Sequence, residues 1–336
     1  MRRILPFFVV LAVGLLPLLI DSLYILSTMV FIGIYAIVTI SLCLLMGYAG
    51  QISLGHAAFY GLGAYGSAIL TVKMAMNPWL AMILAALVTM IIAWGIGIPT
   101  LKLKEHYLAL ATLGFGIIVY IFFMQATVLT GGPSGLTGIP YLSFGSFSFN
   151  SDFRFYYLVW FMVMATIFIC SNIVNSRIGR ALKAIHGSEV AAEAMGIDTS
   201  AVKLQIFVLS AAFASLAGSL YAHYITVLNP SPFGFKMSME FLLMAVVGGI
   251  ASIWGPLFGV TAVTAITEIL KETIPRLIPG AGGEFEIVAF GLILTVIMIF
   301  LPEGLFRGVA DRLERRGNPA YQNIREACED VWEESV

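Results

Sequence analysis

Charged residues are scarce in this chain. Of its 336 residues, 11% are charged and 60% are hydrophobic, whereas a soluble globular protein carries about 25% charged residues. The 19 acidic and 18 basic side chains give a formal net charge of -1. Because no basic excess exists to neutralise phosphates, the composition argues against nucleic-acid binding. It is the composition of a polytopic helical membrane protein.

Cysteine is also rare, and the motifs of several enzyme classes are missing. The three cysteines, Cys43, Cys170 and Cys328, lack the spacing of a disulfide framework or a zinc site. The first two lie in apolar runs, where cysteine packs as a small hydrophobic residue. The sequence contains no G-x-x-x-x-G-K-[ST] motif, so the chain has no P-loop for ATP, and it contains no HExxH or GxSxG motif. We therefore expect no enzyme activity, no bound metal and no cofactor on this chain.

Acidic residues are missing from the middle of the apolar runs. Asp21, Glu240, Glu268 and Glu284 all lie near the ends of such runs. Proton-coupled carriers usually keep carboxylates within the helical bundle. This distribution disfavours an ion-coupled carrier without excluding one.

Long apolar runs dominate what is present, and a membrane-spanning helix needs about 20 mostly apolar residues. Residues 52–70 qualify, although Gly, Ala and Ser make this run typical of a span packed among other helices. Residues 237–270 are too many for one simple helix and are interrupted by Gly248-Gly249 and Gly255-Pro256, so they form either one broken helix or two short segments. The other predicted spans are residues 4–20, 24–46, 79–98, 107–130, 155–174, 204–228 and 285–301.

Basic residues in the loops indicate the orientation, because cytoplasmic loops are enriched in Lys and Arg. With the N-terminus inside and residues 237–270 crossing twice, 13 of the 18 basic residues lie inside. We therefore predict an all-α transmembrane bundle with ten crossings and both termini in the cytoplasm. Residues 1–309 form the transmembrane domain and residues 310–336 a polar cytoplasmic tail. Residues 256–270 are short for a span, so the alternative for them is a re-entrant segment.

A glycine-rich segment, residues 47–66, holds six glycines in twenty residues. Small residues four apart allow helix backbones to approach closely, so its composition favours helix packing, with its polar side chains as hydrogen-bond partners between helices. The alternative is that it lines a translocation path, where irregular backbone is tolerated beside water. The candidate path residues are Gly50, Gln51, Ser53, Gly55, His56, Gly61 and Gly63.

Two loops carry readable patterns. In the polar loop 175–203, residues 189–197 predict a short helix ended by Gly196, because glycine suits the left-handed position after the last helical residue. An alanine-rich helix with charged flanks can bind in a partner's groove, although the pattern alone favours a solvated loop helix. The external loop 130–140 is rich in Gly and Pro, which predicts turns.

Three segments together resemble one family. The glycine-rich segment, the loop 130–140 and the block 180–259 look like the permease subunits of high-affinity branched-chain amino acid ABC importers, and among these the LivM-like subunits. The resemblance covers about residues 24–309, and three motifs in the same order make it specific.

The resemblance implies a subunit that translocates branched-chain or related neutral amino acids handed over by an extracytoplasmic binding protein. It also implies a second, LivH-like permease and two ABC ATPases, which carry the ATP and Mg. The bundle would consist of two inverted halves in the plasma (inner) membrane of a bacterium or archaeon, with the glycine-rich segment as part of the path. The loop 178–197 would dock on an ATPase. Its coupling residues would be Arg180, Lys183, Glu189, Ala191, Ala192 and Gly196.

Two alternatives stay open at this point. The same machinery imports urea, short amides or sugars in the first alternative, because nothing in the spans selects an isobutyl side chain over a urea molecule. In the second, the chain is a stand-alone ion-coupled carrier or channel, which would also lack a P-loop.

Overall fold

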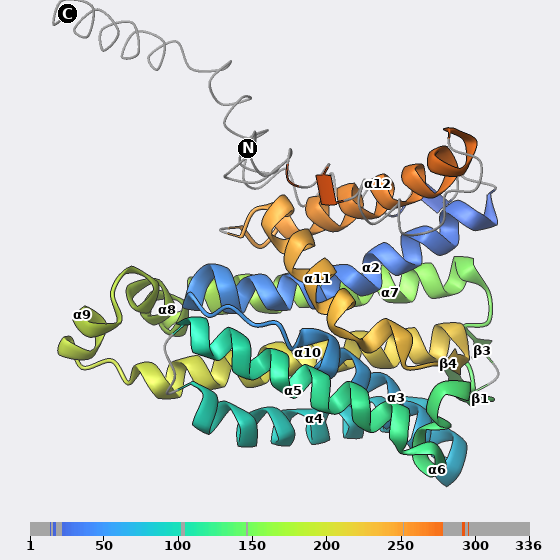
Figure 1. The fold of residues 1–336 in the computed structure, drawn as a ribbon, viewed down its shortest axis with the longest axis horizontal. Helices are drawn as coiled ribbons and strands as arrows, with labels where there is room; N and C mark the ends of the chain where they lie inside the picture. Colours follow the sequence, from blue (N-terminus) through green and yellow to red (C-terminus); the bar gives the residue numbers. More distant parts are fainter. Residues whose placement is uncertain are drawn as a thin grey trace, which may run out of the picture.

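A computed structural model of the chain describes residues 22–101, 105–145, 147–250 and 252–277, with a few isolated positions beyond them. The predicted spans 4–20 and 285–301 lie outside the described residues except at those isolated positions, and the tail 310–336 lies wholly outside them. The described part is a bundle whose long helices run nearly side by side along one direction (Figure 1).

Among the described residues, five helices are long and apolar enough to cross a membrane. They confirm the corresponding predicted spans to within a few residues at most ends. The exception is the predicted span 107–130, because its helix ends at Gln125 and a separate turn, α6 (Thr127–Thr130), follows. The five helices are α2 (Leu23–Cys43) with the π-helix η1 (Leu44–Tyr48), α4 (Pro78–Thr100), α5 (Glu105–Gln125), α7 (Asp152–Asn175) and α10 (Thr199–Ile225).

The predicted span 52–70 forms helix α3 (His56–Met74), which begins later than predicted. The preceding residues 50–55 are not helical, and Gly50 has a φ of 68°. This left-handed conformation is available to glycine at no steric cost and ends the helical path of η1.

The stretch 237–270 forms two helices, α11 (Phe235–Gly248) and α12 (Gly255–Leu277), so the predicted break is confirmed. The prediction that the second half, residues 256–270, is the short one was wrong, because α12 has 23 residues whereas α11 has only 14. At about 1.5 Å per residue, α11 is about 21 Å long, less than the hydrocarbon thickness of about 30 Å. The two helices pack closely, since a Cβ on Gly259 would overlap the Met244 carbonyl oxygen.

Short elements close the end of the bundle opposite α8 (Arg177–Gly187) and α9 (Glu189–Ala194) (Figure 1). β1 (Leu136–Thr137) pairs antiparallel with β4 (Val227–Leu228), and β2 (Ser143–Phe144) pairs with β3 (Phe147–Ser148). The turns η2 (Gly132–Ser134) and η3 (Ser231–Phe233) lie beside them in the sequence. Positive φ angles at the four glycines of the loop 130–140 confirm that this loop is built of turns.

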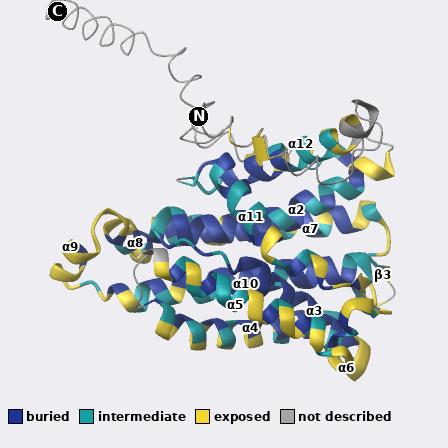
Figure 2. Cartoon of the chain, viewed as in Figure 1, coloured by how far each residue is buried: buried dark blue, intermediate teal, exposed yellow. Residues whose placement is uncertain are grey.

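The core lies around α10, which packs against α2, α3 and α4. Gly63 and Gly218 allow α3 and α10 to touch backbone to backbone, because a Cβ on Gly63 would overlap the Ser215 carbonyl and one on Gly218 the Tyr60 carbonyl. The outward faces of α4 and α5 are exposed (Figure 2) and carry large hydrophobic side chains, as a lipid-facing surface does. Both Cys43 and Cys170 are buried, as predicted.

Candidate functional site

The loop predicted to dock on a partner projects from one end of the bundle as two short helices, α8 (Arg177–Gly187) and α9 (Glu189–Ala194) (Figure 1). Gly196 has a φ of 82°. Its N–H donates to the Glu193 carbonyl at 2.9 Å, and the Ile197 N–H donates to the Ala192 carbonyl at 3.1 Å. These are the two bonds of a Schellman cap, so the predicted short helix ended by glycine is confirmed.

Side chains fasten α9 to the first turns of α10. The Lys203 ammonium group lies 2.5 Å from a Glu189 carboxylate oxygen. One turn along α9, Glu193 accepts a hydrogen bond of 2.8 Å from the Thr199 hydroxyl. The Asp198 carboxylate caps α10 by accepting from the Ala201 N–H at 3.0 Å. A displacement of α9 would therefore act directly on α10.

The predicted coupling residues divide into an exposed group and a buried contact. Arg180, Lys183, Glu189, Ala191 and Gly196 are exposed, whereas Ala192 is buried against the rest of the chain.

Two residues that the sequence analysis did not name stand out at the same tip. Val190 is 78% exposed and Met195 is 83% exposed. Large apolar side chains in a polar loop were a readable signal for them. Exposing two large apolar side chains to water at the same tip is unfavourable, so their exposure favours a docking surface.

The same loop contacts the glycine-rich segment. A Cβ on Gly50 would lie 3.1 Å from Nδ1 of His186 in α8, and α8 packs against η1. On the other side of η1, a Cβ on Gly47 would overlap the Ile250 carbonyl in the turn between α11 and α12. The structure thus brings together two segments that the sequence analysis treated separately.

Gln51, Ser53 and His56 of the glycine-rich segment are buried, and His56 is hydrogen-bonded to another helix. His56 is 1% exposed, with Nδ1 3.0 Å from the Ser53 hydroxyl and Nε2 2.7 Å from the Ser210 hydroxyl. The Ser210 hydroxyl donates its hydrogen to the Ser41 carbonyl at 2.8 Å. It therefore acts as the acceptor in the hydrogen bond with Nε2–H of His56. Gln51 is 3% exposed, and its Oε1 has no hydrogen-bond partner among the described residues.

The glycines of this segment are contact points between helices. Gly55 faces the Thr112 carbonyl of α5, where an added Cβ would come within 2.6 Å of the oxygen. A Cβ on Gly61 would lie 2.6 Å from the Phe123 ring and 3.0 Å from Phe233. With Gly63 against α10, these glycines provide the close packing that the composition favours.

Two helices begin in the interior of the bundle. His56 is the first residue of α3, and its partner Ser210 is the twelfth of the 27 residues of α10, so α3 begins near the middle of α10. The Ala57 N–H donates to the Ser238 hydroxyl in the first turn of α11 at 3.2 Å. The N-termini of α3 and α11 therefore meet at the centre, an arrangement that no local sequence pattern indicates.

Residues 24–302 match the model of a family described as the permease component of branched-chain amino acid transport systems. The chain belongs to this family. The permease is 29% identical over 310 residues to the high-affinity branched-chain amino acid transport system permease protein LivM of Salmonella typhimurium, covering 85% of this chain and 71% of that one.

Two further relatives broaden the comparison. The probable branched-chain amino acid transport permease protein LivM of Methanocaldococcus jannaschii is 24% identical over 313 residues, with 81% of this permease and 90% of the relative covered. The LivH permease protein of Salmonella typhimurium is 28% identical over 290 residues, with the same coverage. With its apolar helices, the permease is a multi-pass membrane protein with a role in transport.

Proposed function

We propose that this permease is a membrane-spanning subunit of an ATP-driven importer for branched-chain or related neutral amino acids. A second, LivH-like permease completes the membrane domain, and an extracytoplasmic binding protein hands over the substrate. Two ABC ATPases bind and hydrolyse ATP with Mg, and this chain carries no cofactor and no catalytic residue. The names of its relatives support this role, since each is a permease of branched-chain amino acid transport.

The proposal includes a topology. The permease crosses the plasma (inner) membrane of a bacterium or archaeon ten times, in two inverted halves, with both termini in the cytoplasm. The basic loop that carries α8 and α9 lies in the cytoplasm by the positive-inside rule. The meeting of the α3 and α11 N-termini supports two halves, because inverted repeats commonly contain interrupted helices that begin near the membrane centre.

The single observation that carries the mechanism is the fixation of α9 on α10. An ATPase binds the exposed tip formed by Val190 and Met195, which are apolar in a polar loop. ATP binding draws the ATPases together and displaces α9, and the Glu189–Lys203 ion pair passes the displacement to α10. The permease contributes the different stabilities of its outward and inward states.

The glycine-rich segment borders the path in this proposal. Gly50, which contacts His186 of α8, and Gly63, which faces the backbone of α10, support a segment that follows the movement of these two helices, while Gly55 and Gly61 face Thr112 and Phe123 of α5. The buried Gln51, Ser53 and His56 supply polar groups on the same stretch.

The experiment compares two glycines of the docking loop, both with no atom near an added Cβ. Gly196 has a positive φ, whereas Gly187 lies at the end of α8 without one. A side chain in the left-handed region costs about 1–2 kcal/mol per residue. Gly196→Val should therefore abolish leucine uptake while the protein still inserts, and Gly187→Ala should transport like the wild type. Normal uptake by a well-expressed Gly196→Val variant contradicts coupling through α9.

Uptake measurements also decide the substrate and the energy source. A deletion strain and its parent are compared with radiolabelled leucine, isoleucine, valine, alanine and urea. Loss of the branched-chain signals supports the proposed cargo, and loss of urea alone replaces the cargo but keeps the machinery. Uptake that follows an ion gradient and persists without ATP refutes the importer and leaves a carrier or channel.

A further inference from the structure

Helix α11 begins inside the bundle without a side-chain cap. Its N-cap residue is Gly234, which has no side chain to accept a hydrogen bond from the first turn. The preceding residue, Phe233, is 1% exposed, and its ring centroid lies 5.4 Å from Tyr60 and 5.5 Å from Tyr65 of α3. Lys236 follows in the first turn and is exposed. Free N–H groups and a lysine at a helix N-terminus attract an anion.

An aromatic cluster with unsatisfied hydroxyl groups lies beside α11. The ring of Tyr60 is 5.7 Å from Phe241 of α11 and 5.5 Å from Tyr221 of α10, and Tyr35 of α2 lies 5.8 Å from Phe241. Tyr60 is fully buried, and among the described residues its hydroxyl has no hydrogen-bond partner. The buried Tyr65 hydroxyl also has no hydrogen-bond partner among the described residues. A buried hydroxyl without a partner costs stability, so one that is retained calls for a ligand or another role.

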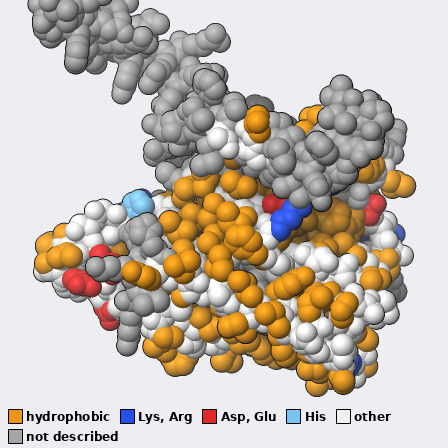
Figure 3. All heavy atoms as spheres, viewed as in Figure 1, with side chains coloured by type: hydrophobic (Ala, Val, Ile, Leu, Met, Phe, Trp, Pro, Cys, Tyr) orange, Lys and Arg blue, Asp and Glu red, His pale blue; other side chains and the backbone are white. Residues whose placement is uncertain are grey.

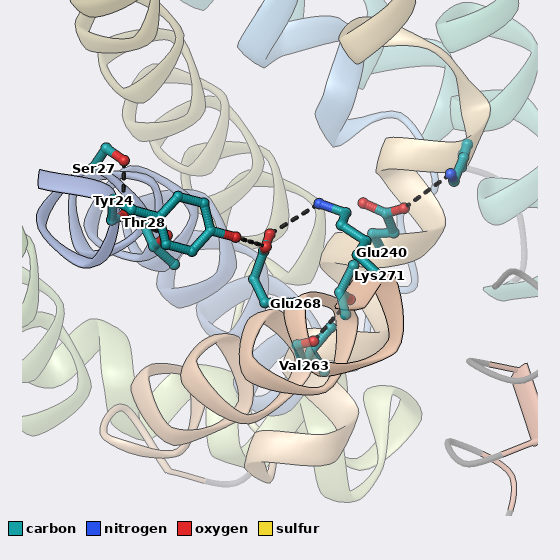
Figure 4. A network of polar contacts seen from close by, with 9 residues as sticks. Tyr24, Ser27, Thr28, Glu240, Val263, Glu268 and Lys271 are labelled. Atoms are coloured by element: carbon teal, nitrogen blue, oxygen red, sulfur yellow. Dashed lines mark hydrogen bonds and ion pairs between the residues drawn. The ribbon is translucent and has the colours of Figure 1, made fainter. Parts of the chain in front are cut away.

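Glu240 connects this cluster to the surface. Its carboxylate lies 3.8 Å from the Lys236 ammonium group one turn earlier, and its side chain is 29% exposed. The Tyr35 ring lies 5.8 Å from the ring of Phe241, the residue after Glu240, and the Tyr221 ring lies 5.5 Å from that of Tyr60. Lys271 of α12 lies nearby and pairs with Glu268 (Figure 4). Polar groups therefore lead from the open surface into the centre of four helices.

The neighbouring carboxylate of Glu268 has different surroundings. It accepts hydrogen bonds from the Tyr24 hydroxyl and from Lys271, the latter at 2.9 Å (Figure 4). Glu240, by contrast, has only the long 3.8 Å pair with Lys236 among the side-chain bonds of the described residues. Such charged groups interrupt a face that is otherwise largely hydrophobic (Figure 3). Charges within a membrane bundle are costly and typically serve function.

We propose that the first two turns of α11 and the aromatic side chains around them form a transient binding site for a zwitterionic amino acid. Glu240 accepts the α-ammonium group, and Lys236 with the free N–H groups of α11 binds the α-carboxylate. The aromatic rings contact the aliphatic side chain. The hydroxyl groups that face the ligand are those of Tyr35, Tyr60 and Tyr221.

The spacing of charges supports this ligand class. An α-amino acid carries its ammonium and carboxylate groups on the same carbon atom, and Lys236 and Glu240 present two opposite charges 3.8 Å apart. In the bound state the ligand ammonium group donates to Glu240 and Lys236 donates to the ligand carboxylate. These two charge-assisted hydrogen bonds replace the long Lys236–Glu240 pair. Urea and sugars carry no charges to match. This site rests on the proposed function, because it takes its ligand from the importer.

The test uses the complete importer in liposomes with its binding protein. Radiolabelled leucine uptake and ATP hydrolysis are measured for Glu240→Gln, with Glu268→Gln as the matched control. Glu240→Gln loses a charged hydrogen bond to the ligand, so uptake at limiting leucine falls about tenfold or more. ATP hydrolysis stimulated by the binding protein stays near the wild-type rate in this variant. Glu268→Gln keeps near-normal uptake, and Glu240→Asp restores part of the loss.

A hydroxyl deletion separates ligand binding from a structural role. Tyr60→Phe removes no hydrogen bond of the protein, so the complex assembles normally while the KM for leucine rises several-fold. Wild-type kinetics in Glu240→Gln, or equal losses in Glu240→Gln and Glu268→Gln, overturn the site and leave the importer standing. Absence of ATP-dependent leucine uptake by the wild-type complex refutes the proposed function and the site with it.

Discussion

The backbone contact between α3 and α10 allows a stability prediction with a definite sign. A Cβ on Gly63 would overlap the Ser215 carbonyl oxygen, and the Ser219 hydroxyl donates to the Gly63 carbonyl at 3.0 Å. Overpacking typically costs about 1–3 kcal/mol. Because the opposing atom belongs to the backbone and cannot rotate away, Gly63→Ala must push the helices apart and weaken the Ser219 bond, worth about 1 kcal/mol. The better helix propensity of alanine offsets about 1 kcal/mol, and with overpacking at the upper end of its range we expect a net loss of about 3 kcal/mol.

The measurement is thermal unfolding of the purified protein in detergent, with Gly95→Ala as the control. Gly95 lies within α4 and has no atom within 4 Å of an added Cβ. Alanine is preferred to glycine within a helix by about 1 kcal/mol, so this variant should unfold at or above the wild-type temperature. At about 2 °C per kcal/mol, Gly63→Ala should unfold about 6 °C lower. Equal unfolding temperatures in the two variants would refute the argument from close packing.

Two further predictions concern side chains. Tyr60→Phe should leave the unfolding temperature unchanged or raise it, because it removes a buried hydroxyl without a partner at a desolvation cost of about 1–3 kcal/mol. Tyr224→Phe should lower it, because the Tyr224 hydroxyl donates to Asp152 at 2.9 Å; a decrease in both variants would contradict the assignment of the free hydroxyl. Glu189→Gln should lower the unfolding temperature, because it leaves the Lys203 ammonium group, whose side chain is only 11% exposed, without its carboxylate partner. The same variant should reduce leucine uptake while ATP hydrolysis continues, and unchanged uptake would show that the pair transmits no movement.

Features that depend on local chemistry or on the membrane were predictable from the sequence. A lipid environment demands long apolar runs, and for that reason most described spans fall where the sequence indicates them. The short helix α9 and its cap at Gly196 were also predictable, because a glycine in the left-handed position is a property of a few consecutive residues. The turns of the loop 130–140 follow from the same kind of local signal.

Features that depend on distant partners were not predictable. Nothing near His56 in the sequence indicates that it bonds to Ser210, 154 positions away. The apolar run that contains α3 continues through Ile52, so hydropathy places the start of the helix too early. Helix α11 is short for a related reason, because the residues before it enter the bundle and pack Phe233 on α3.

The polar contacts of α10 indicate which elements move together when α9 is displaced. One end of α10 holds α9 through Lys203. At the other end, His223 lies 2.7 Å from both the Ser67 hydroxyl of α3 and the Pro140 carbonyl of the outer loop. Between them, Ser215 accepts a hydrogen bond of 3.1 Å from Thr89 of α4. Helices α3, α4 and α10 are therefore joined along their length and should shift as one body.

Helix α11 meets this body in a different way. Its contacts with α3 include a T-shaped contact between the Tyr60 and Phe241 rings and the bond from the Ala57 N–H to Ser238, and its closest backbone packing is with α12. Among the described residues, no glycine brings the backbones of α3 and α11 into contact as Gly63 and Gly218 do for α3 and α10. A displacement of α9 should therefore change the spacing between α3 and α11, where Tyr60 contacts Phe241. The site that we infer for the amino acid thus occupies the boundary that the coupling movement opens and closes.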